Sequence, residues 1–252
     1  MHKITGLITV RTSSTRLHKK CLLKFGENRV IEHIIDRCLI NNIEPIICTT
    51  DDSSDHILCE ISNNKKIQFF RGSNINKILR WYDCATHNNL KSFVTIDADD
   101  PFFCPEEVKR SYELLLNNNY DLILPYKSSS NGSAMVGYSI KTNLLKKALE
   151  KIDINCDTEM AWTYLKAVKG ARFIELSSPE KFEVIGRLTL DYWEDYIFLE
   201  ALRLILGNQP KREDIFIFLK ENPGILNINS FRTKEWEDNQ QKKVYRSNHR
   251  LN

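Results

Sequence analysis

Short apolar runs alternate with segments of helical periodicity through the first half of the chain. The apolar runs predict buried strands at 4–10, 44–50, 67–70, 93–97 and 120–124. The periodic segments predict helices at 30–40, 52–62, 77–87 and 105–115. Strands and helices that alternate in this way favour a mostly parallel sheet with helices on both faces. The predicted fold is therefore a three-layer α/β sandwich.

The second half of the chain is less regular. It opens with a polar loop at 126–133, and strands are predicted at 134–140, 172–176 and 183–190. Helices are predicted at 143–151, 157–168, 193–206 and 213–221. Because neither a repeat nor a linker-like composition interrupts the chain before residue 231, we expect one domain over 1–231, with about 126–180 as an insertion. The polar residues 232–252 are expected to form a C-terminal arm or tail.

Composition excludes several classes of protein. The 252 residues include 36 Lys or Arg and 33 Asp or Glu, so the net charge is only +3. A nucleic-acid-binding protein would be expected to carry a strongly basic face, so no nucleic-acid partner is predicted. No apolar run approaches the ~20 residues that a membrane span needs. The seven Cys include no CxxC pair, which disfavours a disulfide framework or a zinc site and favours the reducing cytoplasm.

The loop after the first strand gathers positive charge. Between Arg11 and Lys20 it carries two Arg, two Lys, one His and four hydroxyl side chains. Open α/β sheets bind their ligands at the carboxyl ends of strands, and both Arg and Lys suit phosphate oxygens. The loop matches neither GxxxxGK[ST] nor GxGxxG. It can be a phosphate-binding loop or an ordinary solvated basic loop.

Three carboxylates, Asp97, Asp99 and Asp100, follow another predicted strand and precede Pro101. Carboxylates this close repel one another, and a hard divalent cation relieves the repulsion. Mg²⁺ commonly takes one or two carboxylates together with substrate phosphates and water. The alternative is an Asp-Pro turn without a ligand.

Asp191 lies between a predicted strand and a predicted helix. Its carboxylate can bind a metal, or it can cap the helix, with Glu194 completing a capping box. Taken together, a basic loop and two carboxylate segments at strand ends describe a nucleoside triphosphate held by Arg, Lys and a metal ion.

These motifs, in this order, resemble the cytidylyltransferases that activate acidic sugars. That family comprises CMP-sugar synthetases for 3-deoxy-manno-octulosonate and for neuraminate-type sugars, and the chain is most similar to the SpsF-like spore-coat polysaccharide branch. The branch opens on A-R-x-x-S-x-R-L-P-G-K-x-L and later carries R-L-T-V-D-x-x-E-D. The matching segments of this chain are Val10–Leu22, Val30–Arg37, Cys48–Asp52, Phe70–Tyr82, Ala98–Pro101, Arg187–Asp195 and Glu221–Ser230.

The resemblance implies a Rossmann-like nucleotidyltransferase fold, related to GT-A, with a small dimerisation insertion. The implied reaction moves CMP from CTP to the hydroxyl of an acidic sugar, of ulosonic or nonulosonic type, with release of pyrophosphate. Such an enzyme would serve cell-surface polysaccharide or glycan synthesis, use Mg²⁺ and act as a homodimer. The implied catalytic residues are Arg11 and Lys20, the implied metal ligands are Asp99 and Asp191, and the implied nucleotide contacts are Arg11, Ser14, Arg16, Lys20, Arg71, Gly72 and Ser73.

The chain departs from the family pattern at three places. His18-Lys19 replaces Pro-Gly before Lys20, Ala98 replaces the Gly before Asp99, and Tyr-Trp replaces Thr-Pro after Asp191. Because Pro and Gly set a tight loop, the path of the first loop can differ. The charged residues are all retained, so the departures bear on the acceptor and on full activity more than on the class of reaction.

Other functions are compatible with the same motifs. A GT-A glycosyltransferase would use Asp97-Ala98-Asp99 as a DxD metal motif. A related nucleotidyltransferase would act on a sugar phosphate. A non-catalytic descendant would bind a nucleotide or a partner protein without turnover.

Overall fold

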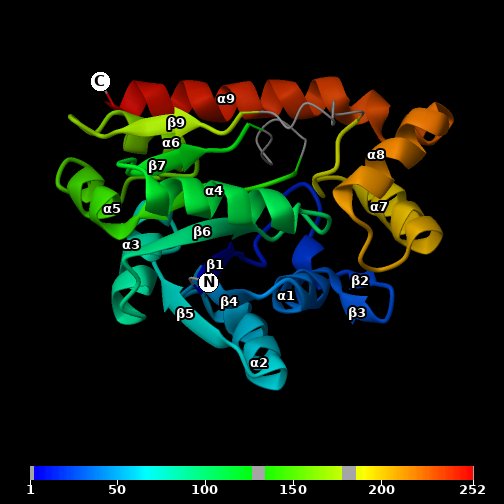
Figure 1. The fold of residues 1–252 in the computed structure, drawn as a ribbon, viewed down its shortest axis with the longest axis horizontal. Coiled ribbons are helices and arrows are strands. Elements are labelled where there is room, and N and C mark those ends of the chain that lie inside the picture. Colours follow the sequence, from blue (N-terminus) through cyan, green and yellow to red (C-terminus); the bar gives the residue numbers. More distant parts are fainter. Residues whose placement is uncertain (1–2, 127–133, 178–185, 252) are drawn as a thin grey trace.

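The computed structural model describes residues 3–126, 134–177 and 186–251 and is built on a seven-stranded sheet (Figure 1). The strands of this sheet are β1 (Ile4–Thr9), β4 (Ile43–Thr50), β5 (Gln68–Gly72), β6 (Ser92–Asp97), β7 (Leu122–Leu124), β8 (Ser139–Lys141) and β9 (Phe173–Glu175). Their order across the sheet is β5-β4-β1-β6-β8-β7-β9. Only β8 runs antiparallel to its neighbours in the described sheet, so the predicted fold class is confirmed. A short hairpin, β2 (Lys24–Phe25) and β3 (Asn28–Arg29), forms a separate pair.

The strand order creates a crevice between the loops that leave β1 and β6. From β1 the chain passes to β4 on one side, and it later returns to β6 on the other side of β1. Thr9 and Asp97 are register partners at the ends of these two strands. The two loops therefore start side by side and diverge, which is where open α/β sheets bind ligands.

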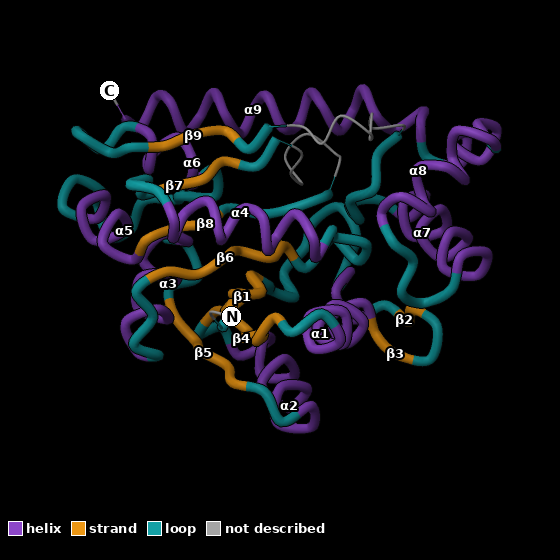
Figure 2. The backbone as a smooth tube through the Cα atoms, in the orientation of Figure 1, coloured by secondary structure: helices purple, strands orange, loops and turns teal. Residues whose placement is uncertain are grey.

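Helices cover both faces of the sheet (Figure 2). They are α1 (Val30–Ile40), α2 (His56–Lys65), α3 (Lys77–His87), α4 (Pro105–Asn117), α5 (Thr142–Leu149), α6 (Ala161–Lys166), α7 (Trp193–Leu206), α8 (Arg212–Glu221) and α9 (Thr233–Leu251). Side chains of β1 alternate between two cores: Ile8 packs in the one that includes α1, α4 and α7, and Leu7 in the one that includes α3, α5 and α6. Burial on both faces explains why the strand is apolar throughout.

Elements of the first half begin and end within about one helical turn of their predicted bounds, but the second half departs further. The strand predicted at 134–140 is only β8, and the helix predicted at 157–168 is only α6. The strand predicted at 183–190 is wrong over its described part, because residues 187–190 join no sheet. There the Leu190 N–H donates to the Asp99 carbonyl at 2.8 Å, so loop contacts replace a strand ladder. Residues 183–185 and 127–133 lie outside the described part of the chain.

Helix α9 occupies the residues expected to form a polar arm or tail. It extends along one edge of the molecule above α6 and β9 (Figure 1), and it contacts α6. Its Trp236 is only 3% exposed. Within the described ranges, no helix combines the length and the apolar character needed to cross a membrane.

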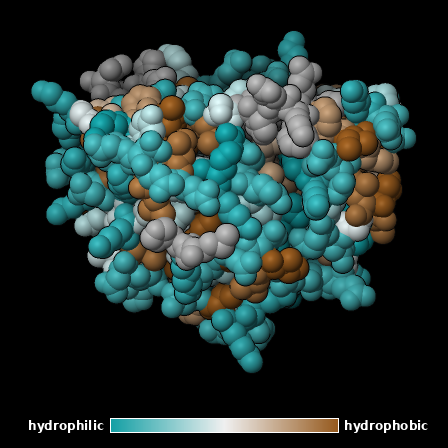
Figure 3. Space-filling view, in the orientation of Figure 1, coloured by the Kyte–Doolittle hydropathy of each residue, from teal (hydrophilic) through white to brown (hydrophobic). Residues whose placement is uncertain are grey.

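Exposed apolar side chains gather on α7 and α8, in the brown region near the right-hand edge of Figure 3. They are Trp193, Ile197, Leu204, Ile205 and Ile217. Patches of this kind often mark protein contact surfaces. Dimerisation itself stays a prediction from the resemblance.

Candidate active site

A cavity of about 610 Å³ lies at the carboxyl ends of β1 and β6. The loop after β1 forms one wall, the ends of β6 and of the segment before α7 form the floor, and α6 and α9 lie opposite. The charged residues that line it are Arg11, Arg16, Lys20, Lys77, Arg80, Lys243 and Arg246, and Asp97, Asp99, Asp157, Glu159 and Asp191. Charges of both signs therefore meet at the site that the strand order predicts.

Buried Asp55 fixes the start of the basic loop. Its Oδ1 accepts hydrogen bonds from the backbone N and from Oγ1 of Thr12, both at 2.7 Å. Its Oδ2 accepts from Thr49 Oγ1 at 3.0 Å and from Thr50 Oγ1 at 2.5 Å. Burial opposes ionisation, but these donors hold the pKa of Asp55 below its usual value. One carboxylate thus ties the basic loop to the end of β4.

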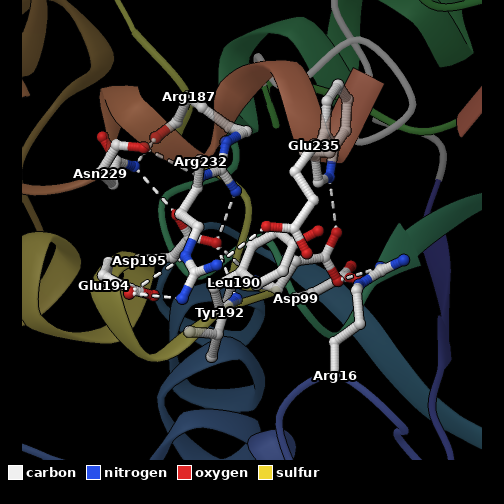
Figure 4. Close-up of polar contacts among 12 residues, drawn as sticks. Arg16, Asp99, Arg187, Leu190, Tyr192, Glu194, Asp195, Asn229, Arg232 and Glu235 are labelled. Atoms are coloured by element: carbon white, nitrogen blue, oxygen red, sulfur yellow. Dashed lines mark hydrogen bonds and ion pairs between the residues drawn. The ribbon is translucent and has the colours of Figure 1, made fainter. Parts of the chain in front are cut away.

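Lys20 joins the two carboxylate segments. Its Nζ lies 2.6 Å from Asp99 Oδ2 and 2.8 Å from Asp191 Oδ1. Arg16 Nη2 reaches the same Asp191 oxygen at 2.5 Å, and Figure 4 marks the contact at the tip of the Arg16 side chain with a dashed line. Burial opposes its charge, yet the two carboxylates raise the pKa of Lys20 above its usual value. Burial also opposes the charge of Asp191, but Lys20 and Arg16 hold its pKa below the usual range.

Asp191 does not cap helix α7; Asp195 does. Asp195 Oδ2 accepts from the backbone N–H groups of Asp191 at 2.9 Å and Tyr192 at 2.8 Å. Arg187 Nη1 lies 2.6 Å from the same oxygen, in an ion pair that is almost wholly buried (Figure 4). The second oxygen of Asp191 accepts from Trp236 Nε1 of α9 at 2.6 Å. The Asp191 carboxylate is therefore free of the capping role and points into the cavity.

Asp99 and Asp191 form a donor set that suits a divalent cation. They come from segments far apart in sequence and converge on the single ammonium of Lys20. In the part of the chain that the structure describes, no three His, Cys, Asp or Glu side chains gather around one point. A hard cation held by two carboxylates takes its remaining ligands from phosphate oxygens and water. The residues present thus fit a metal site that a bound nucleotide would complete.

Comparison with known proteins identifies the family. The sequence profile of the cytidylyltransferases matches residues 5–152, more than half of the chain. The chain belongs to the cytidylyltransferase family. The fold, the resemblance and the enzyme class predicted from the sequence are thereby confirmed.

Three relatives show which proteins this cytidylyltransferase is similar to. An uncharacterized protein of Methanocaldococcus jannaschii is 31% identical over 90% of this chain and 95% of its own length. The spore coat polysaccharide biosynthesis protein SpsF of Bacillus subtilis is 26% identical over 88% of this chain and 96% of its own. The 3-deoxy-manno-octulosonate cytidylyltransferase of Rickettsia bellii is 32% identical, but over only 47% of this chain and 50% of its own.

Solved structures share the fold. A cytidylyltransferase from Leptospira borgpetersenii superposes with a TM-score of 0.79 at 24% identity, covering 90% of this chain and 97% of that one. A CMP:2-keto-3-deoxy-manno-octonic acid synthetase complexed with CTP gives 0.61 at 14% identity, over 81% and 99%. A Mycobacterium tuberculosis protein solved as a manganese complex gives 0.56 at 14% identity, over 79% and 99%.

The nucleotide contacts that the resemblance implies divide into two groups. Within the first loop, Arg11, Ser14, Arg16 and Lys20 all line the cavity. The second group, Arg71, Gly72 and Ser73, is not among the described lining residues. Arg71 instead donates to three carbonyl oxygens, those of Thr50, Asp51 and Asp52. The next two residues, Asn74 and Ile75, line the cavity in their place.

Several lining residues escaped the sequence prediction because no local motif marks them. Lys77 begins α3 and lies 4.0 Å from Asp97, while Glu159 lies 3.6 Å from Arg11 and 3.8 Å from Lys243 of α9. Burial raises the pKa of Asp97, and Lys77 opposes that effect. Only the packing of α6 and α9 against the cavity brings Glu159 and Lys243 into the site.

Lys19 stands where the family pattern has Gly, and its backbone explains that preference. Its φ is +49°, in the left-handed region, immediately before the single helical turn Lys20–Leu22. A side chain in this region costs roughly 1–2 kcal/mol, part of which the greater freedom of unfolded Gly offsets. We expect Lys19→Gly to raise the free energy of unfolding by about 0.5–1 kcal/mol. Chemical denaturation measures this, with Lys19→Ala as the control; equal stabilisation by Ala would contradict it.

Three buried side chains hold the segment that follows Asp99. His33 Nε2 donates to the Pro101 carbonyl at 3.0 Å, Arg212 Nη1 to Phe102 at 3.2 Å and Arg37 Nε to Phe103 at 2.8 Å. Side chains of α1 and α8 thus donate to three consecutive carbonyls, and these hydrogen bonds fix the turn that carries Asp99.

His33 makes stability depend on pH. Burial, then the nearby Arg37, lowers its pKa to about 4 from the usual 6.5. The unfolded chain binds this proton more tightly, so the stability is present above about pH 6.5 and is lost as the pH falls toward about 4. Between about pH 7.5 and about pH 5, the free energy of unfolding should fall by about 2 kcal/mol from this group. Chemical denaturation of His33→Gln should show a smaller fall; an unchanged pH dependence would exclude His33 as the cause.

Proposed function

We propose that the chain transfers CMP from CTP to the hydroxyl of an acidic sugar, of ulosonic or nonulosonic type, with release of pyrophosphate. The observation that carries this proposal is the convergence of Lys20, Asp99 and Asp191 in one cavity beside the basic loop. This arrangement provides cations for phosphate oxygens next to carboxylates for a metal ion. The relative named as a 3-deoxy-manno-octulosonate cytidylyltransferase supports an acidic acceptor, and the relative named for spore coat polysaccharide biosynthesis supports a role in polysaccharide synthesis.

The residues of this chain would act mainly by positioning and by neutralising charge. The oxygen of the sugar hydroxyl forms a bond to the α-phosphorus of CTP, the bond from that phosphorus to the pyrophosphate oxygen breaks, and the hydroxyl proton passes to solvent water. Arg11, Arg16 and Lys20 would bind the triphosphate and offset the charge that grows on the departing pyrophosphate. Lys20 Nζ contacts Asp99, Asp191 and the Leu190 carbonyl, so it would turn toward the phosphate oxygens when a metal ion takes over the two carboxylates.

Asp99 and Asp191 would hold the metal ion, which we propose is Mg²⁺. A bound divalent cation polarises phosphoryl oxygens and lowers the pKa of a neighbouring hydroxyl. The solved relative with manganese supports divalent metal use. We also propose, from the resemblance, a cytoplasmic homodimer that serves cell-surface polysaccharide or glycan synthesis.

Pyrophosphate release tests this function directly. The full chain is supplied with each of the four nucleoside triphosphates, Mg²⁺ and a panel of ulosonic, nonulosonic and neutral sugars or sugar phosphates. We expect release only with CTP and an acidic sugar, and none after chelation of the metal. Release with a sugar phosphate would favour the related nucleotidyltransferase, and release with no combination would favour a non-catalytic descendant.

A further inference from the structure

One face of α9 lines the cavity. Trp236 bonds Asp191, and Gln240, Lys243 and Ser247 line the cavity beyond it. These four residues are spaced 4, 3 and 4 apart, so they share one side of the helix. At ~1.5 Å per residue, the stripe runs about 16 Å along the axis. It therefore begins at the proposed metal ligands and continues across the wall opposite the basic loop.

Positive charge is in excess where this stripe faces α6. Glu159, just before α6, lies 3.8 Å from Lys243 and 3.6 Å from Arg11. Burial alone would raise its pKa, but Lys77, Lys243, Arg11 and Arg80 lower the pKa of Glu159 to about 2. The single carboxylate of Glu159 thus lies among several cations, and the region around it can accommodate an additional anion.

The triphosphate already has partners elsewhere in the cavity. Arg11, Arg16 and Lys20 lie on the loop wall, next to Asp99 and Asp191 on the floor. The opposite wall combines Trp162, Glu159 and the Gln240 amide with the cations of α9. An aromatic ring, hydrogen-bonding groups and a cation are side chains suited to an acidic sugar.

A buried hydroxyl near the proposed metal ligands has no hydrogen-bond partner among the described residues. Thr189 is 1% exposed and lines the cavity, two residues before Asp191. Its Oγ1 has no hydrogen-bond partner among the residues that the structure describes. Buried polar atoms are rarely left without one, so Thr189 indicates that a substrate group with hydrogen-bonding atoms lies between the two walls.

We infer that α9 forms the acceptor subsite, in which Lys243, with Arg246 beside it, binds the carboxylate of the sugar acceptor. The inference rests on the proposed function and specifies its second substrate. On binding, Lys243 exchanges its contact with Glu159 for the sugar carboxylate, and Glu159 becomes available to accept from sugar hydroxyls. The C-terminal helix, outside the segment that the family profile matches, thereby selects acidic over neutral acceptors.

The test compares Lys243→Gln with Lys242→Gln in the full chain. Lys242 is the adjacent, exposed lysine, and it does not line the cavity. The acceptors are N-acetylneuraminate, 3-deoxy-manno-octulosonate and, as a neutral counterpart, the methyl ester of N-acetylneuraminate. Pyrophosphate release gives KM for each acceptor and for CTP, and binding of CTP with Mn²⁺ is titrated separately.

Lys243→Gln removes the charged hydrogen bond to the sugar carboxylate, so the KM of the acidic acceptor should rise about ten- to a hundredfold. The KM and binding constant of CTP should stay within about twofold, and the preference for acid over ester should disappear. Lys242→Gln should behave like the unaltered chain.

Three results would overturn the inference. If Lys243→Gln raised the KM for CTP and left the acceptor KM unchanged, Lys243 would bind the nucleotide. If Lys243→Gln left both KM values unchanged, α9 would only shield the cavity from solvent. Equal KM values of the unaltered chain for N-acetylneuraminate and for its methyl ester would remove the acidic subsite but keep the transferase. Failure of the proposed function is distinct from these, because the unaltered chain would then release no pyrophosphate from CTP with any acceptor.

Discussion

Replacing Asp99 by Asn is expected to lower the rate of pyrophosphate release from CTP by about 10³-fold or more, because the variant loses a charged metal ligand. The free energy of unfolding should change by no more than about 1 kcal/mol, since Lys20 keeps its contact with Asp191 and Asp99 is 24% exposed. Steady-state kinetics over a range of Mg²⁺ concentrations and thermal unfolding measure the two effects. Near-normal turnover would contradict the assignment of Asp99 to the metal.

Two further variants separate the proposed site from the glycosyltransferase alternative. A DxD motif would need Asp97 and Asp99 together, whereas the site around Lys20 pairs Asp99 with Asp191. Asp97 lies beside a different lysine, Lys77, at 4.0 Å. We therefore expect Asp191→Asn to match the loss in Asp99→Asn, and Asp97→Asn to lose less than about tenfold. The reverse order would favour the DxD motif.

Replacing Lys20 by Ala is expected to raise the KM for CTP about tenfold and to lower kcat about 10²-fold or more, because one preorganised cation at the triphosphate is lost. Stability should also fall, by up to about 3 kcal/mol, because two partly or fully buried carboxylates lose a shared partner. Arg16 still pairs with Asp191 at 2.5 Å, so the fold should persist. Initial-rate kinetics below the unfolding temperature separate the catalytic effect from the structural one.

The matched control for Lys20→Ala is Lys24→Ala. Lys24 lies four residues further along the same segment, is exposed and does not line the cavity. Its removal should leave KM and kcat within about twofold. If Lys20→Ala behaved in the same way, the first loop would be an ordinary solvated basic loop.

Local pattern predicted the first half of the fold well because its strands are buried on both faces and its helices are amphipathic. In β1, Ile8 and Leu7 face different cores, so the run is apolar throughout and easily recognised. Pattern failed at Arg187–Leu190, where an alternation of polar and apolar residues resembles a strand. All four side chains there are buried, and the segment is held by contacts with the loop at Asp99 and with Asn229 instead of a sheet.

The first loop and the two carboxylate segments could be chosen from the sequence because each carries its charge locally, at the end of a predicted strand. The position of Arg71 outside the cavity lining could not be predicted from the sequence, because it depends on the three backbone carbonyls to which its guanidinium donates. Lys243 could not be chosen at all. It lies in a polar segment, and the face of this helix that lines the cavity can be recognised only from the hydrogen bond between Trp236 and Asp191.

The sequence by itself determined the order of the main strands and helices in the first half of the chain, the chemical character of the basic loop and the identity of the acidic residues that follow the strands. These properties depend on side-chain periodicity and on residue type, which are local. Only the tertiary structure decided that Lys20 lies between Asp99 and Asp191, that Asp195 takes over the helix cap, and that α9 closes the cavity opposite the loop. The two contacts of Lys20 join residues 79 and 171 positions apart, and no local pattern encodes such distances. They arise when burial of both cores brings the carboxyl ends of β1 and β6 together.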